Sequence, residues 1–203
     1  MANYTTLTGL KTVDGAIRAW VNRSDVPATV ILTEAQALIY ERLRVREMQA
    51  RATLTFALST QTASLPTGFL DPIGYKPYEW GGDLSFVHEN ALGEYRDSSG
   101  VLESGTPSRW TIVGETAYVN VLPSEAFSGI LLYYKSPTVL SGSNETNFLT
   151  ERYPTLLRYA CMAKAYEHMK DEQSANYLGL TMQTIADINS SNELWRRNQF
   201  IPA

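Results

Sequence analysis

The chain has 203 residues and a formal net charge of -4, with 44% apolar and 19% charged residues. This length allows one domain with a sizeable core, and the composition excludes a disordered chain. No run approaches the ~20 apolar residues of a membrane helix, and an acidic chain is a poor candidate for gripping DNA through its phosphates.

The N-terminus lacks a charged start followed by an apolar run, so we expect no secretory signal and a protein that stays where it is made.

The first third of the chain is predicted to be helical. Apolar residues from Leu10 to Val21 recur on one face, which predicts a helix over residues 10–22. Pro27 suits the first turn of a second helix, which is expected to run to about Arg46.

The middle of the chain is predicted to be rich in β-structure. A turn at 114–115 separates two strands and predicts a hairpin, and a further strand is expected to complete an antiparallel meander with it. Between 74 and 107 glycine and proline are frequent and regular pattern is scarce, so this long segment is expected to have a function or to order on a partner. The predicted strands are 53–58, 110–113, 118–122 and 129–134.

Helices are predicted to return in the last third. Tyr153 and Pro154 mark the start of one helix, and a final helix carries Leu178, Met182 and Ile185 on one apolar face. The last eleven residues have no helical or strand pattern and are predicted to be extended.

Together these elements predict one α+β domain over residues 1–203. The first and last thirds, 8–47 and 148–192, are expected to form a helical bundle. The β-rich region, 50–135, is predicted to be a small antiparallel insertion in this bundle, and 193–203 an extended C-terminal tail.

Catalytic chemistry has little support in the sequence. No metal-ligand spacing, nucleophile elbow or phosphate-binding loop occurs, so we expect no enzyme, no metal and no cofactor. Cys161 lies in an apolar helical pattern and is expected to be a buried small hydrophobe. The catalytic alternative is a hydrolase in which His88 works as acid or base with Glu89 or Glu94, near Asp97.

A cluster of basic residues follows the second predicted helix. One interpretation is a solvated helix end, where positive charge offsets the helix dipole; the other is a subunit interface or a surface that faces a DNA channel. A DNA-binding module acting through this cluster is a third hypothesis, which the acidic balance of the chain disfavours. The cluster consists of Arg42, Arg44, Arg46 and Arg51.

Two sets of residues are candidates for contacts with other proteins. The C-terminal tail combines aromatic and apolar side chains with arginines, the types most frequent at binding hot spots, and is predicted to dock on a partner rather than fold back on its own bundle. These tail residues are Leu194, Trp195, Arg196, Arg197, Phe200 and Ile201. The second set comprises aromatic residues of the irregular middle segment, Tyr75, Tyr78, Trp80, Phe86 and Tyr95.

The order of several sequence blocks resembles the head-to-tail adaptor (head-completion, connector) proteins of tailed bacteriophages, particularly those of short-tailed phages. The similarity spans nearly the whole chain and rests on ordered blocks rather than on a catalytic signature. Those blocks include ERLRVREM at 41–48, LPTGFL at 65–70, WTIVGE at 110–115, LLYYKSP at 131–137 and TNFLTERYPTL at 146–156.

This resemblance implies a structural protein of the virion, assembled in the host cytoplasm and located at the capsid–tail junction. It implies a ring, commonly of twelve copies, that binds the portal of the filled capsid through the C-terminal tail. The β-rich region would then face a tail or nozzle protein. DNA would pass through the ring on ejection without being bound specifically, and the family implies no catalytic residue.

Overall fold

The computed structural model describes residues 2–79, 84–96 and 98–198, and for 194–198 it describes the backbone. The chain divides into two compact units. Residues 1–47 and 137–203 form the first, which we call the helical unit, and residues 48–136 form the second, the β unit. The combination of helices with largely antiparallel sheets confirms the predicted α+β class.

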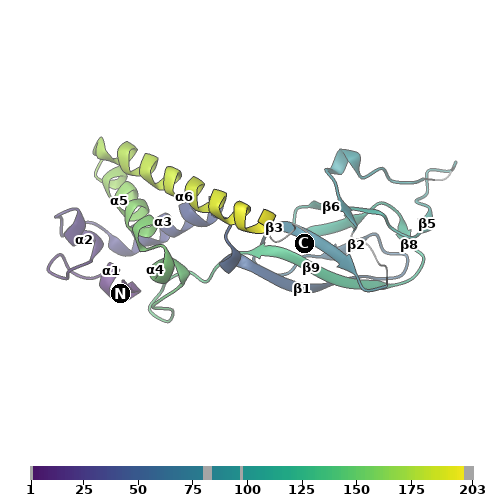
Figure 1. Ribbon diagram of the computed structural model, residues 1–203, viewed down its shortest axis with the longest axis horizontal. Helices are drawn as coiled ribbons and strands as arrows, with labels where there is room; N and C mark the ends of the chain where they lie inside the picture. Colours follow the sequence, from purple (N-terminus) through teal and green to yellow (C-terminus); the bar gives the residue numbers. More distant parts are fainter. Residues whose placement is uncertain (1, 80–83, 97, 199–203) are drawn as a thin grey trace. The chain divides into compact units, whose positions relative to one another are not determined.

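The helical unit is organised around α5, which packs against both α3 and α6 and contacts α2 and α4 (Figure 1). Leu32 and Ile39 of α3 and Leu156 of α5 are fully buried. Ala160 and Ala163 are small and buried, so a neighbouring helix can approach α5 closely. The helices are α1 (Tyr4–Leu7), α2 (Ile17–Trp20), α3 (Ala28–Arg42), α4 (Phe148–Arg152), α5 (Pro154–His168) and α6 (Gln173–Asn198).

The predicted first helix over 10–22 is wrong. The chain instead forms the short helices α1 and α2, and Leu10, expected on the buried face, is 71% exposed. Gly15 lies between them with φ of +85°, a left-handed conformation that ends helical propagation. The second helix ends at Arg42 rather than near residue 46, because Leu43 adopts an extended backbone.

The β unit contains two principal sheets. In one, β9 (Phe127–Lys135) lies between β1 (Gln49–Phe56) and β3 (Phe69–Pro77). In the other, β6 (Arg109–Val113) and β7 (Thr116–Val119) form the predicted hairpin. β2 (Thr62–Ser64) and β4 (Ser85–Phe86) flank this hairpin, and β5 (Ser104–Gly105) pairs with β8 (Leu122–Pro123). All neighbouring strands of the two principal sheets are antiparallel except β4 and β6.

The expected meander is therefore wrong in its pairing. The strand predicted at 129–134 exists, as β9, but it pairs with β1 and β3 and not with the hairpin. From Phe127 to Leu132 its side chains alternate between buried and half-buried positions, as suits the central strand of a sheet with a core on one face. The predicted irregular segment at 74–107 contributes the end of β3, the short strands β4 and β5, and a 3₁₀ turn, η2 (Glu89–Ala91).

Aromatic rings dominate the core of the β unit. Phe56 and Phe127 stack with their centroids 5.0 Å apart, and Tyr75 lies 5.8 Å from Trp110. The Tyr75 hydroxyl donates a hydrogen bond of 3.0 Å to the Leu54 carbonyl oxygen, which satisfies the one polar group that this ring buries. Tyr75 is thus a core residue, and its predicted role in a partner-facing loop is wrong.

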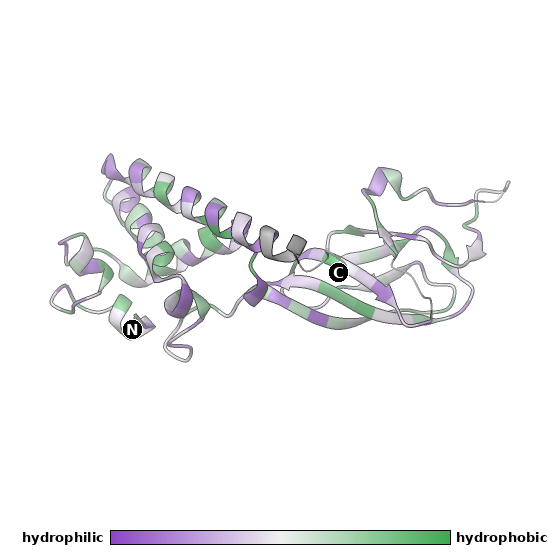
Figure 2. Ribbon diagram, in the orientation of Figure 1, coloured by the Kyte–Doolittle hydropathy of each residue, from purple (hydrophilic) through white to green (hydrophobic). Residues whose placement is uncertain are grey.

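The last helix differs from its prediction at both ends. Leu178 is exposed, whereas Ile185 is buried as predicted. The ring of Tyr177, which precedes Leu178, stacks on Tyr166 of α5 with the centroids 5.4 Å apart. Figure 2 shows polar and apolar residues alternating along α6. The predicted extended tail at 193–203 is helical as far as Asn198. Among the described residues, no helix is long and apolar enough to cross a membrane.

Candidate interaction sites

The segment that follows α3 is held by the C-terminal half of α6. The Asn189 side chain accepts a hydrogen bond from the Arg44 backbone N–H at 2.8 Å and donates one to the Arg42 carbonyl oxygen at 2.9 Å. The end of a helix leaves carbonyl groups without intrahelical partners. Asn189 satisfies one of these carbonyl groups, that of Arg42, and also binds the backbone N–H of Arg44 just beyond the helix.

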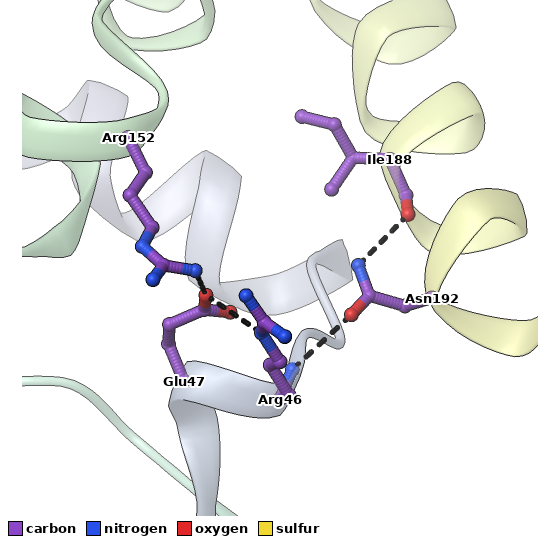
Figure 3. Close-up of polar contacts among 5 residues, drawn as sticks. All are labelled: Arg46, Glu47, Arg152, Ile188 and Asn192. Carbon is purple, nitrogen blue, oxygen red and sulfur yellow. Dashed lines mark hydrogen bonds and ion pairs between the residues drawn. The ribbon is translucent and has the colours of Figure 1, made fainter. Parts of the chain in front are cut away.

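One turn further along α6, Asn192 makes a second contact with the segment that follows α3 (Figure 3). Its side-chain oxygen accepts a hydrogen bond from the Arg46 backbone N–H at 3.4 Å, and its amide donates to the Ile188 carbonyl oxygen at 3.0 Å. We call Asn189 and Asn192 the asparagine clamp. Sequence reasoning missed it, although two asparagines three residues apart on one helix face are a recognisable signal of side-chain bonding to a neighbouring backbone.

An ion cluster lies beside the clamp. The Glu47 carboxylate accepts hydrogen bonds from the guanidinium groups of Arg152 and of Arg46, the latter at 3.3 Å (Figure 3). The Glu47 side chain is only 15% exposed, whereas both arginines are about half exposed, so solvent screens this cluster and each pair is worth ~1 kcal/mol or less. Its structural effect is to connect η1 (Arg46–Met48) to the end of α4.

The predicted arginine cluster is not one surface element. Arg44 directs its guanidinium to the carbonyl oxygens of Tyr40 and Leu43, at 3.0 and 2.8 Å, and so caps the end of α3. Arg46 belongs to the ion cluster, whereas Arg51 lies on β1 in the other unit. For Arg44 and Arg46 these contacts favour the interpretation as a helix end.

Replacement of Asn189 by alanine should loosen the segment after α3. Both hydrogen bonds to it are lost, and we expect the free energy of unfolding of the helical unit to fall by about 1–2 kcal/mol. Hydrogen exchange at the Arg44 amide should accelerate. Asn176→Ala, at an exposed position of the same helix, is the matched control and should change neither quantity. Equal exchange rates in the two variants would contradict the role of the clamp.

The remaining aromatic candidates in the middle of the chain are surface residues. Tyr78, Phe86 and Tyr95 are each more than half exposed, and Trp80 lies outside the described residues. Phe86 contacts the edge of Trp110 with ring centroids 5.0 Å apart, so it covers the core on one side and meets solvent on the other. These three residues are available to a partner.

Among the described residues, no hydrogen bond or ion pair joins His88 to Glu89 or Glu94. His88 accepts a weak hydrogen bond of 3.5 Å from the Asn90 backbone N–H and begins η2. The Glu94 carboxylate accepts a hydrogen bond from Gln61 at 2.9 Å and pairs with Arg96, and these bonds lower its pKa. A carboxylate held ionised in this way is suited to accept hydrogen bonds rather than to act as an acid.

Two further expectations concern metal ligands and the single thiol. In the part of the chain that the structure describes, no three His, Cys, Asp or Glu side chains are grouped to hold a metal ion. Asp97 lies outside the described residues. Cys161 is fully buried in α5, as predicted, and burial raises the pKa of its thiol, which keeps it protonated and unreactive.

The predicted docking tail is described only in part. Residues 194–197 continue the helical backbone of α6, and their side chains lie outside the described residues. Phe200 and Ile201 also lie outside them. The asparagine clamp holds the turn of α6 that immediately precedes these positions.

Charge is distributed unequally between the two units. Residues 48–136 carry nine acidic and five basic side chains, whereas the rest of the chain carries twelve of each. The whole net charge of -4 therefore belongs to the β unit. An acidic surface repels DNA phosphates and attracts basic partners.

The chain matches a known protein family. The family model described as SU10 adaptor protein matches residues 5–200, which covers nearly the whole of both units. A comparison with the curated proteins finds no match.

Proposed function

We propose that this chain, which belongs to the SU10 adaptor protein family, forms the ring that joins the portal of the filled phage capsid to the tail. The family is one of phage head–tail adaptors, so the chain is a structural virion protein of the capsid–tail junction. The observation that carries the proposal is the extent of the family match, from residue 5 to residue 200. Assembly in the host cytoplasm is part of the proposal.

The ring would contain twelve copies joined by a repeated head-to-tail interface, which closes when the rotation between neighbours divides a full turn. The helical unit is the part assigned to this interface. Arg42 is exposed on the last turn of α3 and could pair with an acidic residue of the next copy. Arg46 and Arg152 already pair with Glu47, so they would contribute surface shape and local charge to the interface between copies.

The portal would be bound by the C-terminal tail. Its candidate residues, Leu194, Trp195, Arg196, Arg197, Phe200 and Ile201, are of the kinds that dominate interface energies. Two features support this assignment: α6 continues as a helix to Asn198, and the asparagine clamp fixes the preceding turn to the rest of the unit. A firmly anchored helix presents its end to a partner at a lower entropic cost than a free chain does.

The β unit would face a tail or nozzle protein. Its exposed aromatic residues Tyr78, Phe86 and Tyr95 are candidates for this contact. The acidic balance of the unit also suits a conduit, because DNA that passes an acidic wall is not retained by it. Transient passage of DNA without specific binding follows from the same argument.

The native mass of the protein, alone and mixed with its portal, tests the ring. Twelve copies of a 22.7 kDa chain have a total mass of about 272 kDa. When the portal is present, we expect a complex in which the copies of this chain account for this mass. A chain that stays monomeric and separate from the portal would overturn the proposal.

Removal of residues 194–203 tests the docking tail separately. We expect the truncated chain to lose about tenfold or more of its affinity for the portal, because the aromatic and arginine anchors are gone. Removal of Pro202 and Ala203 alone is the control and should leave the affinity unchanged. If the longer truncation binds as the full chain does, the tail is not the portal contact, even where the ring still forms.

A further inference from the structure

The two edge strands of the β1–β9–β3 sheet differ in how they are protected. β3 carries Pro72 and Pro77, and its register with β9 shifts twice. Its Tyr75 carbonyl oxygen also accepts a hydrogen bond from the Leu84 N–H at 3.3 Å. Prolines and bulges keep a sheet edge from pairing with another chain. β1 has neither and pairs with β9 along its whole length without a shift, so it is the open edge of this sheet (Figure 1).

Alternate backbone groups of β1 point away from β9. On β9, the Ser128 carbonyl oxygen accepts a hydrogen bond of 2.9 Å from the Tyr78 N–H, so the backbone groups of Ser128 point to the β3 side. Successive residues of a strand point their N–H and C=O groups to opposite sides. Gly129 therefore points to β1 and meets its register partner Leu54, and the β1 residues on either side of Leu54 point outward. The residues with outward groups are Arg51, Thr53 and Thr55.

These outward groups have no hydrogen-bond partner within residues 2–79, 84–96 and 98–198. All three residues are exposed, so they present three donors and three acceptors in a row, at the spacing that an added strand requires. Arg51 is the one charged side chain of β1, and no described carboxylate pairs with it. The edge is thus available to a strand from another chain.

We propose that β1 pairs antiparallel with β1 of a second copy of this chain. A strand that adds to an open edge must itself have an open edge of similar length. Of the strands that the structure describes, β1 alone has one, because β3 is protected and the other edge strands have two or three residues.

The side chains of β1 also suit pairing with themselves. A register centred on residue 52 or 53 brings the two strands together along nearly their whole length. It places Arg51 opposite Thr53 or Thr55 of the other copy, and never opposite a second Arg51. β-Branched residues pair favourably across strands, whereas like charges directly opposite each other are unfavourable. The pattern of β1 therefore opposes no like charges in these registers.

This contact is isologous, so it closes with two copies and does not build a ring. It covers the open edge of the free protein, and the inference does not rest on the proposed function. The net charge of -4 on each β unit opposes the contact. Salt at about 0.15 M screens charges beyond about 8 Å, so we expect a reversible dimer that tightens as the salt concentration rises.

Hydrogen exchange of single amides, in the full chain without the portal, tests the pairing directly. We expect protection of the Arg51, Thr53 and Thr55 amides to rise with protein concentration. The Ala52 and Leu54 amides, which face β9, should be protected at every concentration. Sedimentation of the same samples should show a change from 22.7 kDa to the mass of two copies, about 45 kDa. A chain that stays monomeric, grows beyond two copies or dimerises without this alternation overturns the proposal.

Thr53→Pro removes the outward N–H at the middle of the edge and no bond to β9. We expect it to weaken dimerisation about tenfold or more, since each copy loses one donor, and to leave the thermal unfolding of the monomer nearly unchanged. Thr53→Val keeps the N–H and the β-branched shape and is the matched control. A folded proline variant that dimerises as the control does would exclude β1 as the contact.

A pair of substitutions at Thr55 tests the register without placing proline in a strand. Residue 55 lies opposite or diagonal to Arg51 of the other copy, so Thr55→Glu should dimerise about threefold more tightly than the wild type and Thr55→Lys about threefold less. Both variants lose the same 2.8 Å contact with the Ser128 hydroxyl. Net charge alone acts in the opposite direction, because lysine makes the β unit less acidic. The reverse order of affinities would therefore contradict β1 pairing.

The outcomes separate this inference from the proposed function. If the free chain does not dimerise through β1 but forms a ring on the portal, the inference falls and the proposed function stands. If the dimer forms with the expected exchange pattern but no ring appears on the portal, the inference stands and the proposed function falls.

Discussion

We expect Gly129→Ala to lower the free energy of unfolding of the β unit by about 3 kcal/mol. A Cβ at this position would lie 2.5 Å from the Lys76 carbonyl oxygen and 2.8 Å from the Pro77 Cα, both of them backbone atoms of β3. Backbone cannot rotate away as a side chain can, so β9 and β3 must separate. β9 is the central strand of its sheet, and this separation would disrupt the pairing on which the sheet depends.

A second glycine of the same sheet provides the control. Gly74 lies on β3, and a Cβ there would meet no atom within 4 Å. Gly74→Ala should therefore leave the stability of the β unit nearly unchanged, or raise it slightly by restricting the unfolded chain. Denaturant-dependent hydrogen exchange of peptides from residues 48–136 measures both variants. If they prove equally stable, close strand packing is not the reason for a glycine at position 129.

Local pattern was sufficient to predict much of the fold. The turn at Gly114 and Glu115 predicted the β6–β7 hairpin, and Tyr153 and Pro154 predicted the start of α5. The pairing of β9 was not predictable, because alternation shows that a segment is a strand and says nothing of which strand it joins. The predicted helix over 10–22 does not form, because Gly15 interrupts it, although the spacing of Leu10 fits a helix.

The candidate sites depend on contacts between residues far apart in sequence. Asn189 is more than a hundred residues from Arg44 in the sequence, and Arg152 is equally far from Glu47. No periodicity in the sequence brings these groups together. Composition alone did indicate that the chain is acidic, but the division into units was needed to place that charge on residues 48–136.

Gln36→Ala should have a comparably large effect in the helical unit. Gln36 is 1% exposed on α3, and its side-chain oxygen accepts a hydrogen bond of 2.7 Å from the backbone N–H of Leu140. Leu140 is itself buried in the segment that leads from the β unit back to α4. Alanine would leave this N–H without a partner and create a cavity, for a combined loss of about 3 kcal/mol in the free energy of unfolding.

Gln36→Leu divides this effect into its two causes. Leucine fills most of the volume, so its cost of about 1–2 kcal/mol should come from the unpaired Leu140 N–H. Hydrogen exchange of peptides from α3 and α5, measured across a denaturant series, reports on the helical unit separately from residues 48–136. A leucine variant as stable as the wild type would mean that water satisfies the Leu140 amide. Because Gln36 and Gly129 belong to different compact units, each substitution should leave the exchange of the other unit nearly unchanged, and equal destabilisation of both would mean that the two units unfold together.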